Sequence, residues 1–421
     1  MEIIKLINIQ KKEHTLEYEF TTTEGLRKYF SGKPFRIEYT FSVESIPNSI
    51  AAVPFVCNVL PIIWLTNSVL ELNELDKAFY DSIPQFKQGY VEMFPECNFL
   101  GIISVKSLVE CDIPSTEKSA TFFSGGLDAV NTLVMHLDEK PALISIWGSD
   151  IKYENASGWK VVHDEISKTA KLYNLNDIVI RSTFREFDNE YELENTIKIN
   201  WWHDLKHGIG LLGHAAPYVY EQGISKLYIA SSNCPLDKDI KCASHPTIDN
   251  HVRFAHTKVV HDGYEYSRQD KAHNVVEYSK KSGEKVSLHV CWKTQTGNNC
   301  CKCEKCYRTM LGIISEGADP VDFGFFEAPT YIPNCRQFLI GKRNLETSIA
   351  KRHWTHIHNA FVNNLKVIKK TPYWKHVKWI YKSDFSHPET LNMPPKSLRE
   401  WLSRQKFYQK LHDIKINMKK S

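Results

Sequence analysis

The sequence predicts an α/β protein built on a parallel sheet. From Ala120 onward, apolar segments typical of strands alternate with segments of helical periodicity, which is the rhythm of a sheet covered by helices on both faces. A glycine pair follows the first strand, and four closely spaced cysteines end the same region. The expected strands are Ala120–Phe123, Ala142–Trp147, Asp177–Ser182 and Lys226–Ser231, and the expected helices are Ala129–Leu137, Val161–Tyr173 and Leu205–Gln222.

The length and composition indicate a soluble protein with more than one domain. A chain of 421 residues exceeds one ordinary core, and 42% hydrophobic with 24% charged residues is typical of globular proteins. No apolar run approaches the ~18 residues of a membrane helix. The N-terminus has no apolar signal-peptide segment, so we expect a cytoplasmic protein that does not enter membranes.

Residues 1–115 are predicted to form a separate α+β module. Phe35–Val43 alternates with a period of two, which indicates a strand. The apolar run Ile50–Leu65 contains Pro54 and Pro61, so it is predicted to be broken strand and turn rather than one helix. Because nothing in the module looks catalytic, we interpret it as a cap or a partner-binding domain.

The stretch Thr121–Asp128, TFFSGGLD, is predicted to bind phosphate. Gly125 and Gly126 lie between a strand and a helix, where their backbone N–H groups can converge on an anion near the positive end of the helix dipole. The stretch matches neither the Walker pattern nor the dinucleotide fingerprint. A glycine-rich turn without a ligand is the alternative.

Polar residues follow all four predicted strands. The first strand leads to Ser124 and Asp128, and the second leads to Gly148. Thr183 and Arg185 follow the third strand, and Ser231 and Ser232 follow the fourth. Because ligands bind at the carboxyl ends of parallel strands, these residues predict a nucleotide site at that edge of the sheet.

The connection Asp237–Lys271 is long and rich in titratable side chains, which favours a substrate and phosphate region. A surface excursion whose histidines only form hydrogen bonds is the alternative. Its candidate catalytic and phosphate-binding residues are Lys258, His261 and Arg268, and it also holds His245, His251 and His256.

Cys291, Cys300, Cys303 and Cys306 have the spacing C-x8-C-x2-C-x2-C, which predicts a tetrahedral zinc site. Cys301 is taken as the spare sulfur, because using it in place of Cys300 would give a C-x-C spacing that is too tight. Four protein ligands leave no open position, so the zinc is expected to be structural. A disulfide pair and an iron–sulfur cluster are the alternatives.

Residues 321–421 are predicted to form a mostly helical basic extension. Lysines and aromatic residues interleave from Lys366 to Lys420, although the net charge of the whole chain is only +4. An ordinary solvated helical domain is favoured over a nucleic-acid surface, because no nucleic-acid motif accompanies the charge.

The glycine loop and the cysteine pattern together resemble the PP-loop ATP pyrophosphatases, and in particular the QueC-like (7-cyano-7-deazaguanine synthase-like) proteins. The resemblance covers roughly residues 118–316. It implies a Rossmann-like core of the adenine nucleotide alpha hydrolase type over residues 116–320. It also implies a phosphate loop at Ser124, Gly125, Gly126 and Asp128 beside the four zinc cysteines.

The resemblance implies an ATP-dependent ligase or amidating enzyme. ATP would adenylate a carboxylate or amide oxygen, pyrophosphate would leave, and an amine or ammonia would displace AMP. Mg²⁺ is expected near Asp128, with Lys258 or Arg268 receiving charge on pyrophosphate and His261 or His245 as a base. Such proteins occur beside bacterial polysaccharide or anti-phage gene clusters.

The sequence departs from this family at several positions. Ala129 stands where the family has a serine, and the second strand ends in a different turn. A nucleotide-binding subunit that has lost turnover therefore remains an alternative, and the N-terminal module is the expected contact for a protein partner. Sulfur transfer onto RNA, with Cys234 or Cys242 reactive, is another alternative. A homodimer is one possible oligomeric state.

Overall fold

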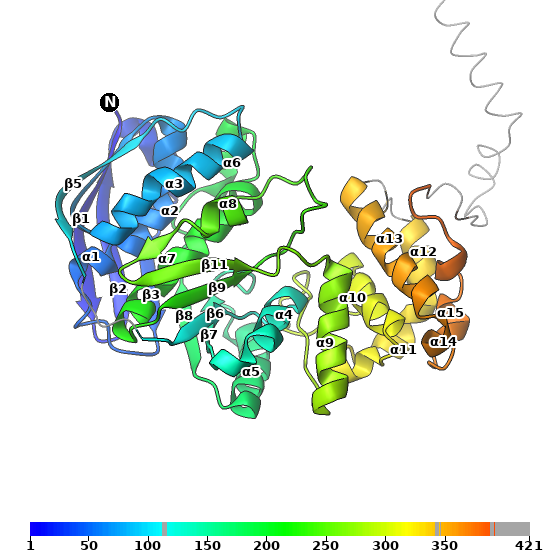
Figure 1. Cartoon of the computed structure of the whole chain (residues 1–421). Helices are drawn as coiled ribbons and strands as arrows, with labels where there is room; N and C mark the ends of the chain where they lie inside the picture. Colours follow the sequence, from blue (N-terminus) through cyan, green and yellow to red (C-terminus); the bar gives the residue numbers. More distant parts are fainter. Residues whose placement is uncertain (112–115, 342–344, 346, 388–390, 392–421) are drawn as a thin grey trace, which may run out of the picture.

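The computed structural model describes residues 1–111, 116–341, 345, 347–387 and 391. Eleven strands in these residues form one sheet in the order β10-β11-β9-β6-β7-β8-β3-β2-β1-β4-β5 (Figure 1). They are β1 (Ile3–Lys12), β2 (Thr15–Thr22), β3 (Phe35–Tyr39), β4 (Val69–Asp76), β5 (Ile102–Val109), β6 (Ser119–Phe122), β7 (Ala142–Trp147), β8 (Asp177–Ser182), β9 (Lys226–Ala230), β10 (Arg253–Phe254) and β11 (Thr257–Asp262).

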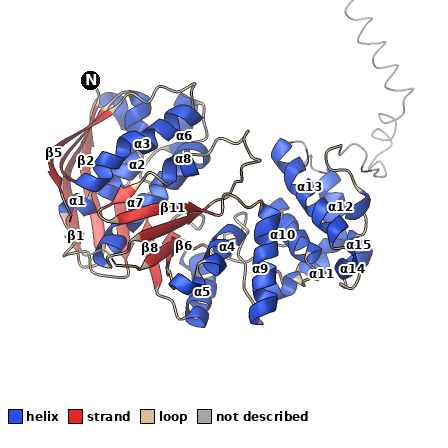
Figure 2. Ribbon diagram, viewed as in Figure 1, coloured by secondary structure: helices blue, strands red, loops and turns tan. Residues whose placement is uncertain are grey.

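Helices surround the sheet and form the far end of the molecule, where α9 to α15 lie beyond the strands (Figure 2). The α-helices are α1 (Asn48–Ala51), α2 (Val53–Thr66), α3 (Lys77–Met93), α4 (Leu127–Met135), α5 (Ala156–Tyr173), α6 (Glu190–Ile197), α7 (His207–Glu221), α8 (Pro246–Asp249), α9 (Arg268–Ser282), α10 (Glu304–Ser315), α11 (Ala328–Tyr331), α12 (Cys335–Gly341), α13 (Ser348–Asn363), α14 (Leu365–Ile368) and α15 (Trp374–Val377). Short 3₁₀ turns are η1 (Glu24–Tyr29), η2 (Leu137–Glu139), η4 (Pro320–Phe323), η5 (Ile332–Asn334) and η6 (Ile380–Lys382), and η3 (Trp201–Lys206) is a π-helical turn.

The α/β class predicted from the sequence is confirmed. The strands β11, β9, β6, β7 and β8 are parallel neighbours, and the four predicted strands coincide with β6, β7, β8 and β9 to within one residue at each end. The predicted helices correspond to α4, α5 and α7, and the third of them begins as the π-helical turn η3. Helical and strand periodicity were therefore sufficient to locate this part of the fold.

The strands of the N-terminal region extend the same sheet. β3 pairs antiparallel with β8, with Ile37 opposite Ser182 and Tyr39 opposite Ile180. Buried side chains from residues 4–111 and from the parallel strands lie in one hydrophobic cluster. The division into domains at residues 115 and 320 stays a prediction, but the first of these boundaries crosses a continuous sheet and a shared core.

The prediction for Ile50–Leu65 was wrong, because this run forms α1 and α2. Pro54 lies in the first turn of α2, where a proline costs no hydrogen bond, and Pro61 lies inside the helix. The interior proline costs about 3 kcal/mol, but nearly every side chain of α2 is buried, and each buried apolar side chain contributes about 1.5–3 kcal/mol. The free energy gained by burying the side chains of α2 therefore outweighs the cost of the interior Pro61.

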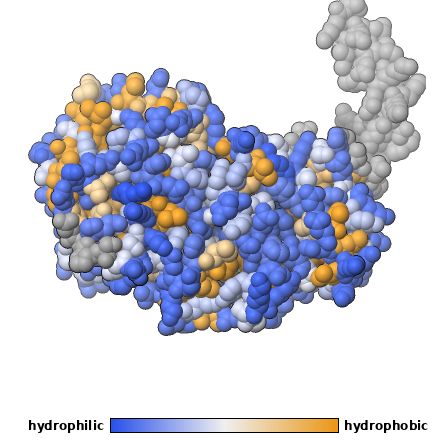
Figure 3. All heavy atoms as spheres, in the orientation of Figure 1, coloured by the Kyte–Doolittle hydropathy of each residue, from blue (hydrophilic) through white to orange (hydrophobic). Residues whose placement is uncertain are grey.

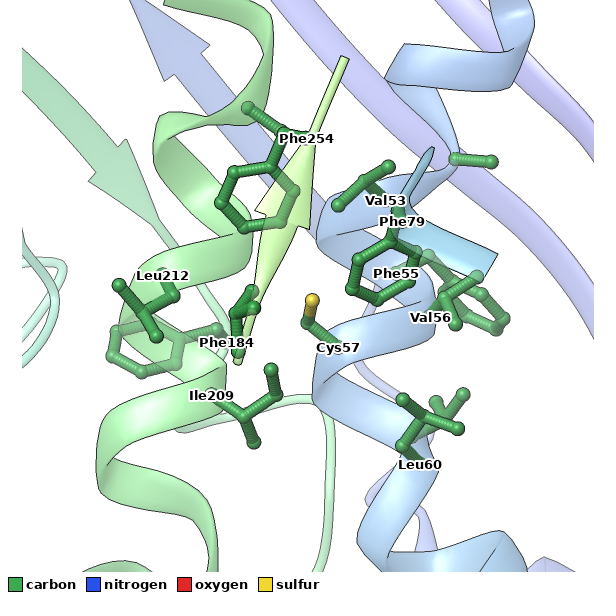
Figure 4. Packing of buried hydrophobic residues seen from close by; sticks show 14 of the residues in the cluster. Val53, Phe55, Val56, Cys57, Leu60, Phe79, Phe184, Ile209, Leu212 and Phe254 are labelled. Atoms are coloured by element: carbon green, nitrogen blue, oxygen red, sulfur yellow. The ribbon is translucent and has the colours of Figure 1, made fainter. Parts of the chain in front are cut away.

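The partner of α2 is α7, and Figure 4 shows their apolar side chains facing one another around Cys57. Gly213 of α7 allows this close approach, since a Cβ there would lie 2.6 Å from the Cβ of Cys57. A second buried cluster joins α4, α5, α9 and α10 to the C-terminal helices. Strand β7 contributes to both clusters, Ile144 to the first and Leu143 to the second.

The described part of residues 321–391 is helical, as predicted. The basic run beyond residue 391 lies outside the described residues. Among the described helices, none combines the length and the apolar character needed to cross a bilayer. The face seen in Figure 3 is mostly hydrophilic, with small separate apolar patches.

Candidate functional site

The predicted phosphate loop lies where the strand order of the sheet reverses. From β6 the chain continues on one side to β7 and β8, and it later returns to β9 on the other side of β6. Such a reversal leaves a crevice at the carboxyl ends of the strands, where open α/β sheets bind ligands. Gly125 has a φ of +73°, and Gly126 caps the N-terminus of α4. Gly125 therefore adopts a left-handed conformation that favours glycine, whereas Gly126 has an ordinary φ of −67°.

A cavity of about 210 Å³ opens above this loop, which is far more than a single water requires. Its lining includes both polar and apolar residues. Among the polar or loop residues are Ser124, Gly126, Asp128, Asp150, Arg268 and Lys305. Among the apolar residues are Ile144, Ile151, Trp159, Val162, Ile166 and Leu211.

Asp128 is held as an anion between two cations. Its carboxylate accepts a hydrogen bond from Nη1 of Arg268 at 2.8 Å, and Nζ of Lys271 lies 3.5 Å from its other oxygen. Burial favours the neutral acid, but the charges of Arg268 and Lys271 outweigh it and lower the pKa of Asp128 to about 2. The carboxylate therefore stays ionised throughout the physiological range.

The four predicted zinc cysteines come together. The Sγ atoms of Cys291, Cys300, Cys303 and Cys306 all lie within 4.8 Å of one another, and Sγ of Cys300 lies 3.9 Å from that of Cys306. A tetrahedron of thiolates around zinc, with Zn–S bonds of about 2.3 Å, needs S···S distances of about 3.8 Å. The cluster can therefore hold a metal ion, and its four soft sulfur donors fit zinc.

Residues 288–303, which we call the cysteine loop, are hydrogen-bonded directly to the predicted phosphate loop. The backbone N–H of His289 donates to the carbonyl oxygen of Gly125 at 2.7 Å. The side chain of Asn299 holds the loop in shape, because it accepts from Val290 N–H and donates to the carbonyl of Leu288. A metal that fixes this loop therefore also fixes the wall of the cavity.

The structure brings six of the predicted site residues to the cavity, namely Ser124, Gly126, Asp128, Ser232, Arg268 and the metal-site residue Cys291. It does not bring Lys258, which is exposed near the amino end of β11 and pairs in register with Lys226. The backbone carbonyl of Gly125 accepts a hydrogen bond from His289 N–H. Ser231 is buried, and its backbone carbonyl accepts a hydrogen bond from Nζ of Lys271.

His261 lies outside the cavity lining, in a buried cluster of its own. Its Nδ1 is 2.8 Å from Oδ2 of Asp249, and the hydroxyl of Ser244 donates to the same carboxylate oxygen. His245 lies beside it and reaches the hydroxyl of Tyr264 at 3.2 Å. Of the four histidines that the sequence placed in this connection, His245 and His261 lie next to one another, and none of the four lines the cavity.

Gly148 is required for packing, and replacing it with alanine is expected to destabilise the fold by about 2 kcal/mol. Its φ is +113°, and a Cβ would lie 2.0 Å from the carbonyl oxygen of Ser182 on the neighbouring strand. Urea unfolding of Gly148→Ala measures the change. Gly283→Ala is the control, because Gly283 has a φ of +76° and open space around its Cβ position. Equal losses in both variants would show that the contact with Ser182 does not matter.

Several cavity residues were not identified as site residues from the sequence, among them Asp150, Lys305, His289 and His207. Lys305 and His289 flank cysteines of the metal cluster, and His207 starts α7. The one signal that could have indicated Lys305 is a basic residue between two zinc ligands, since such a residue must follow the cysteine loop to wherever it packs. His207 gave no signal, because only the folded chain brings α7 to this edge of the sheet.

Comparisons of the chain with protein-family models, with curated proteins and with solved structures found no match. The geometry of the site therefore carries the functional argument.

Proposed function

We propose that the cavity binds ATP and that the protein is an ATP-dependent, AMP- and pyrophosphate-forming enzyme with a QueC-like, PP-loop core. The observation that carries this proposal is a glycine loop at the reversal point of a parallel sheet, beside a cavity lined by both charged and apolar side chains. A nucleotide likewise combines charged phosphates with a flat base.

The residues of the cavity have distinct roles in this proposal. The loop N–H groups and the N-terminus of α4 bind the phosphates. Arg268 and Lys305 receive the negative charge that grows on pyrophosphate as it leaves. Lys305 takes the part that the sequence assigned to Lys258, because it lines the cavity and Lys258 does not. The substrate is a carboxylate or amide oxygen, which adenylation turns into a good leaving group.

Two metals belong to the proposal. Zinc, held by the four cysteines, has a structural role, because four protein ligands leave no position for a substrate. Mg²⁺ was expected near Asp128, but that carboxylate already pairs with Arg268 and Lys271. Asp150, an exposed carboxylate on the same cavity, is the better ligand for Mg²⁺ bound with the phosphates.

ATP binding is expected to weaken about tenfold or more in Gly126→Ala, because the new methyl group occupies space where the phosphates approach the backbone. Gly126 has a φ of −67°, so alanine fits without strain, and its Cβ would lie 3.3 Å from Oγ of Ser124. Isothermal titration calorimetry with ATP and Mg²⁺ measures the affinity, and tenfold corresponds to about 1.4 kcal/mol. Lys258→Gln is the charge control and is expected to bind ATP like the wild type.

Failure of the wild-type protein to bind ATP would refute the proposal. If ATP binds but no pyrophosphate is released with any acid or amide that co-purifies with the protein, the nucleotide-binding subunit without turnover becomes the better interpretation.

Sulfur transfer is disfavoured by the surroundings of its two candidate cysteines. Cys234 and Cys242 are both buried, and burial raises the pKa of each thiol, that of Cys242 to about 12. Neither is therefore a ready thiolate nucleophile.

A further inference from the structure

A second, smaller cavity lies beyond Arg268, between α9, α10 and α13. Two arginines and two histidines line it, namely Arg268, Arg308, His353 and His356. Arg268 is shared with the candidate nucleotide cavity, so its guanidinium lies between the two hollows. The side chains of Arg268 and Arg308 are only 8% and 14% exposed, so water does little to solvate their charges.

Several donors in this cluster lack hydrogen-bond acceptors among the described residues. They include Nε and Nη2 of Arg268, Nε of Arg308 and Nδ1 of His356. A buried donor that is left unpaired costs about 1–3 kcal/mol, and more when it is charged. Their convergence on one small cavity indicates that an acceptor belongs there.

Each of the two arginines has one carboxylate nearby. Asp128 pairs with Arg268, and a carboxylate oxygen of Glu304 lies 3.7 Å from Nε of Arg308. Nη1 of Arg308 also contacts Nδ1 of His353. Burial, then the charges of Arg308 and Arg268, lower the pKa of His353 to about 2, so the imidazole stays neutral beside them. An oxyanion would accept from the donors that these contacts leave unpaired.

The cavity has lining residues in common with an open groove. Its volume is about 10 Å³, which is room for one water-sized group, such as a single oxygen of an oxyanion. Gln269 and His356 also line a polar groove of about 490 Å³ between α9 and α13. A ligand with one oxygen against the arginines would therefore have this groove beside it.

We propose that Arg268, Arg308, His353 and His356 form an oxyanion site that binds an oxygen of the carboxylate or phosphate group of a small molecule. Arginine is well suited to both groups, because its planar fork donates two parallel hydrogen bonds to either of them. The site lies one side chain away from the candidate nucleotide cavity. Its use as an anchor for the acid that ATP activates depends on the proposed function, whereas oxyanion binding does not.

The test is calorimetric titration of the full-length, metal-loaded protein with inorganic phosphate and, separately, with glutarate. The wild type is expected to bind at least one of them. Arg308→Gln and His356→Phe are each expected to weaken that binding roughly tenfold or more, since a hydrogen bond to a charged group contributes about 1.5–3 kcal/mol. Tighter binding of glutarate would assign a carboxylate to the site, and tighter binding of phosphate would assign a phosphate.

Arg352→Gln is the matched control. Arg352 is also on α13, but it pairs with Asp237 and Asp239 and lines neither the cavity nor the groove. If Arg308→Gln proves unfolded in a melting experiment, His356→Phe carries the test alone, because phenylalanine keeps the ring and removes the donors. Gly126→Ala separates phosphate bound at the glycine loop from phosphate bound here.

The proposal is overturned if the wild type binds neither anion, or if the folded variants bind as tightly as the wild type. These results are independent of ATP. A protein that binds ATP but neither anion would retain the proposed function and lose the oxyanion site. A protein whose anion binding depends on Arg308 and His356 but which ignores ATP would retain only the oxyanion site.

Discussion

Replacing Cys303 with serine is expected to release the metal from the four-cysteine cluster and to destabilise the surrounding fold by at least about 3 kcal/mol. Structural zinc sites contribute about 10–16 kcal/mol of apparent binding free energy in small peptides. The expected loss of stability is smaller here, because the cysteine loop and α10 are also stabilised by packing in a hydrophobic cluster. Elemental analysis of the purified variant measures the metal, and urea unfolding measures the stability.

Cys303 is the most informative position for this test, because it is both a member of the cysteine cluster and the N-cap of α10. Its Sγ belongs to the cluster, and it is also the N-cap residue of α10, where it lies 3.5 Å from the backbone N–H of Cys306. Serine is itself a good N-cap. A loss of stability in Cys303→Ser therefore reports the loss of the metal and not the loss of the cap.

Two further cysteine variants separate the ligands from their neighbours. Cys97→Ser, at a half-buried thiol in the N-terminal region, is expected to keep the metal and most of the stability. Cys301→Ser is also expected to keep the metal, because Cys301 lies outside the cluster and burial raises the pKa of its thiol to about 11. Metal loss in Cys301→Ser with retention in Cys300→Ser would show that the ligand set is wrong.

The parallel half of the fold was predictable from the sequence because local signals and tertiary context agree there. β7 and β8 have the bounds that their apolar runs predicted, and α4 follows directly from the glycine pair. In Ile50–Leu65 the two disagree. The local signal of Pro54 and Pro61 favours a break, but burial against α7 is a long-range effect, and no short window of sequence contains it.

The candidate site was predictable to the extent that it depends on motifs. The cysteine spacing gave all four members of the cluster, and the glycine loop gave the floor of the cavity. The cations were harder to predict. Lys258 and Lys305 look alike as single letters, and only the direction of β11 and the packing of the cysteine loop decide which of them reaches the cavity. Spacing along the chain carries no information on that choice.

Asp188→Asn is expected to destabilise the protein by about 3–5 kcal/mol, because it leaves a buried lysine charge without its partner. Asp188 accepts a hydrogen bond from Nζ of Lys206 at 2.6 Å, and neither side chain is exposed. Trp201 also donates to this carboxylate at 2.8 Å, and the ammonium of Lys206 lies over the ring of Phe187. The pair joins the segment after β8 to the start of α7.

The expected cost comes from desolvation more than from lost attraction. Burial raises the pKa of Asp188 and lowers that of Lys206, so for each group desolvation outweighs the field of its partner. An ion pair of this kind adds little net stability, although removing one partner alone is costly. The two single substitutions and the double substitution therefore have different expected effects.

A double-mutant cycle tests this directly. Lys206→Met alone leaves a buried carboxylate and is expected to cost as much as Asp188→Asn, whereas Asp188→Asn with Lys206→Met buries no charge and is expected to be more stable than either single variant. Chemical denaturation of all four proteins at one pH gives the coupling energy. Additive losses, with the double variant the least stable of the four, would mean that the pair contributes stability through its attraction and that this account of the buried charges is wrong.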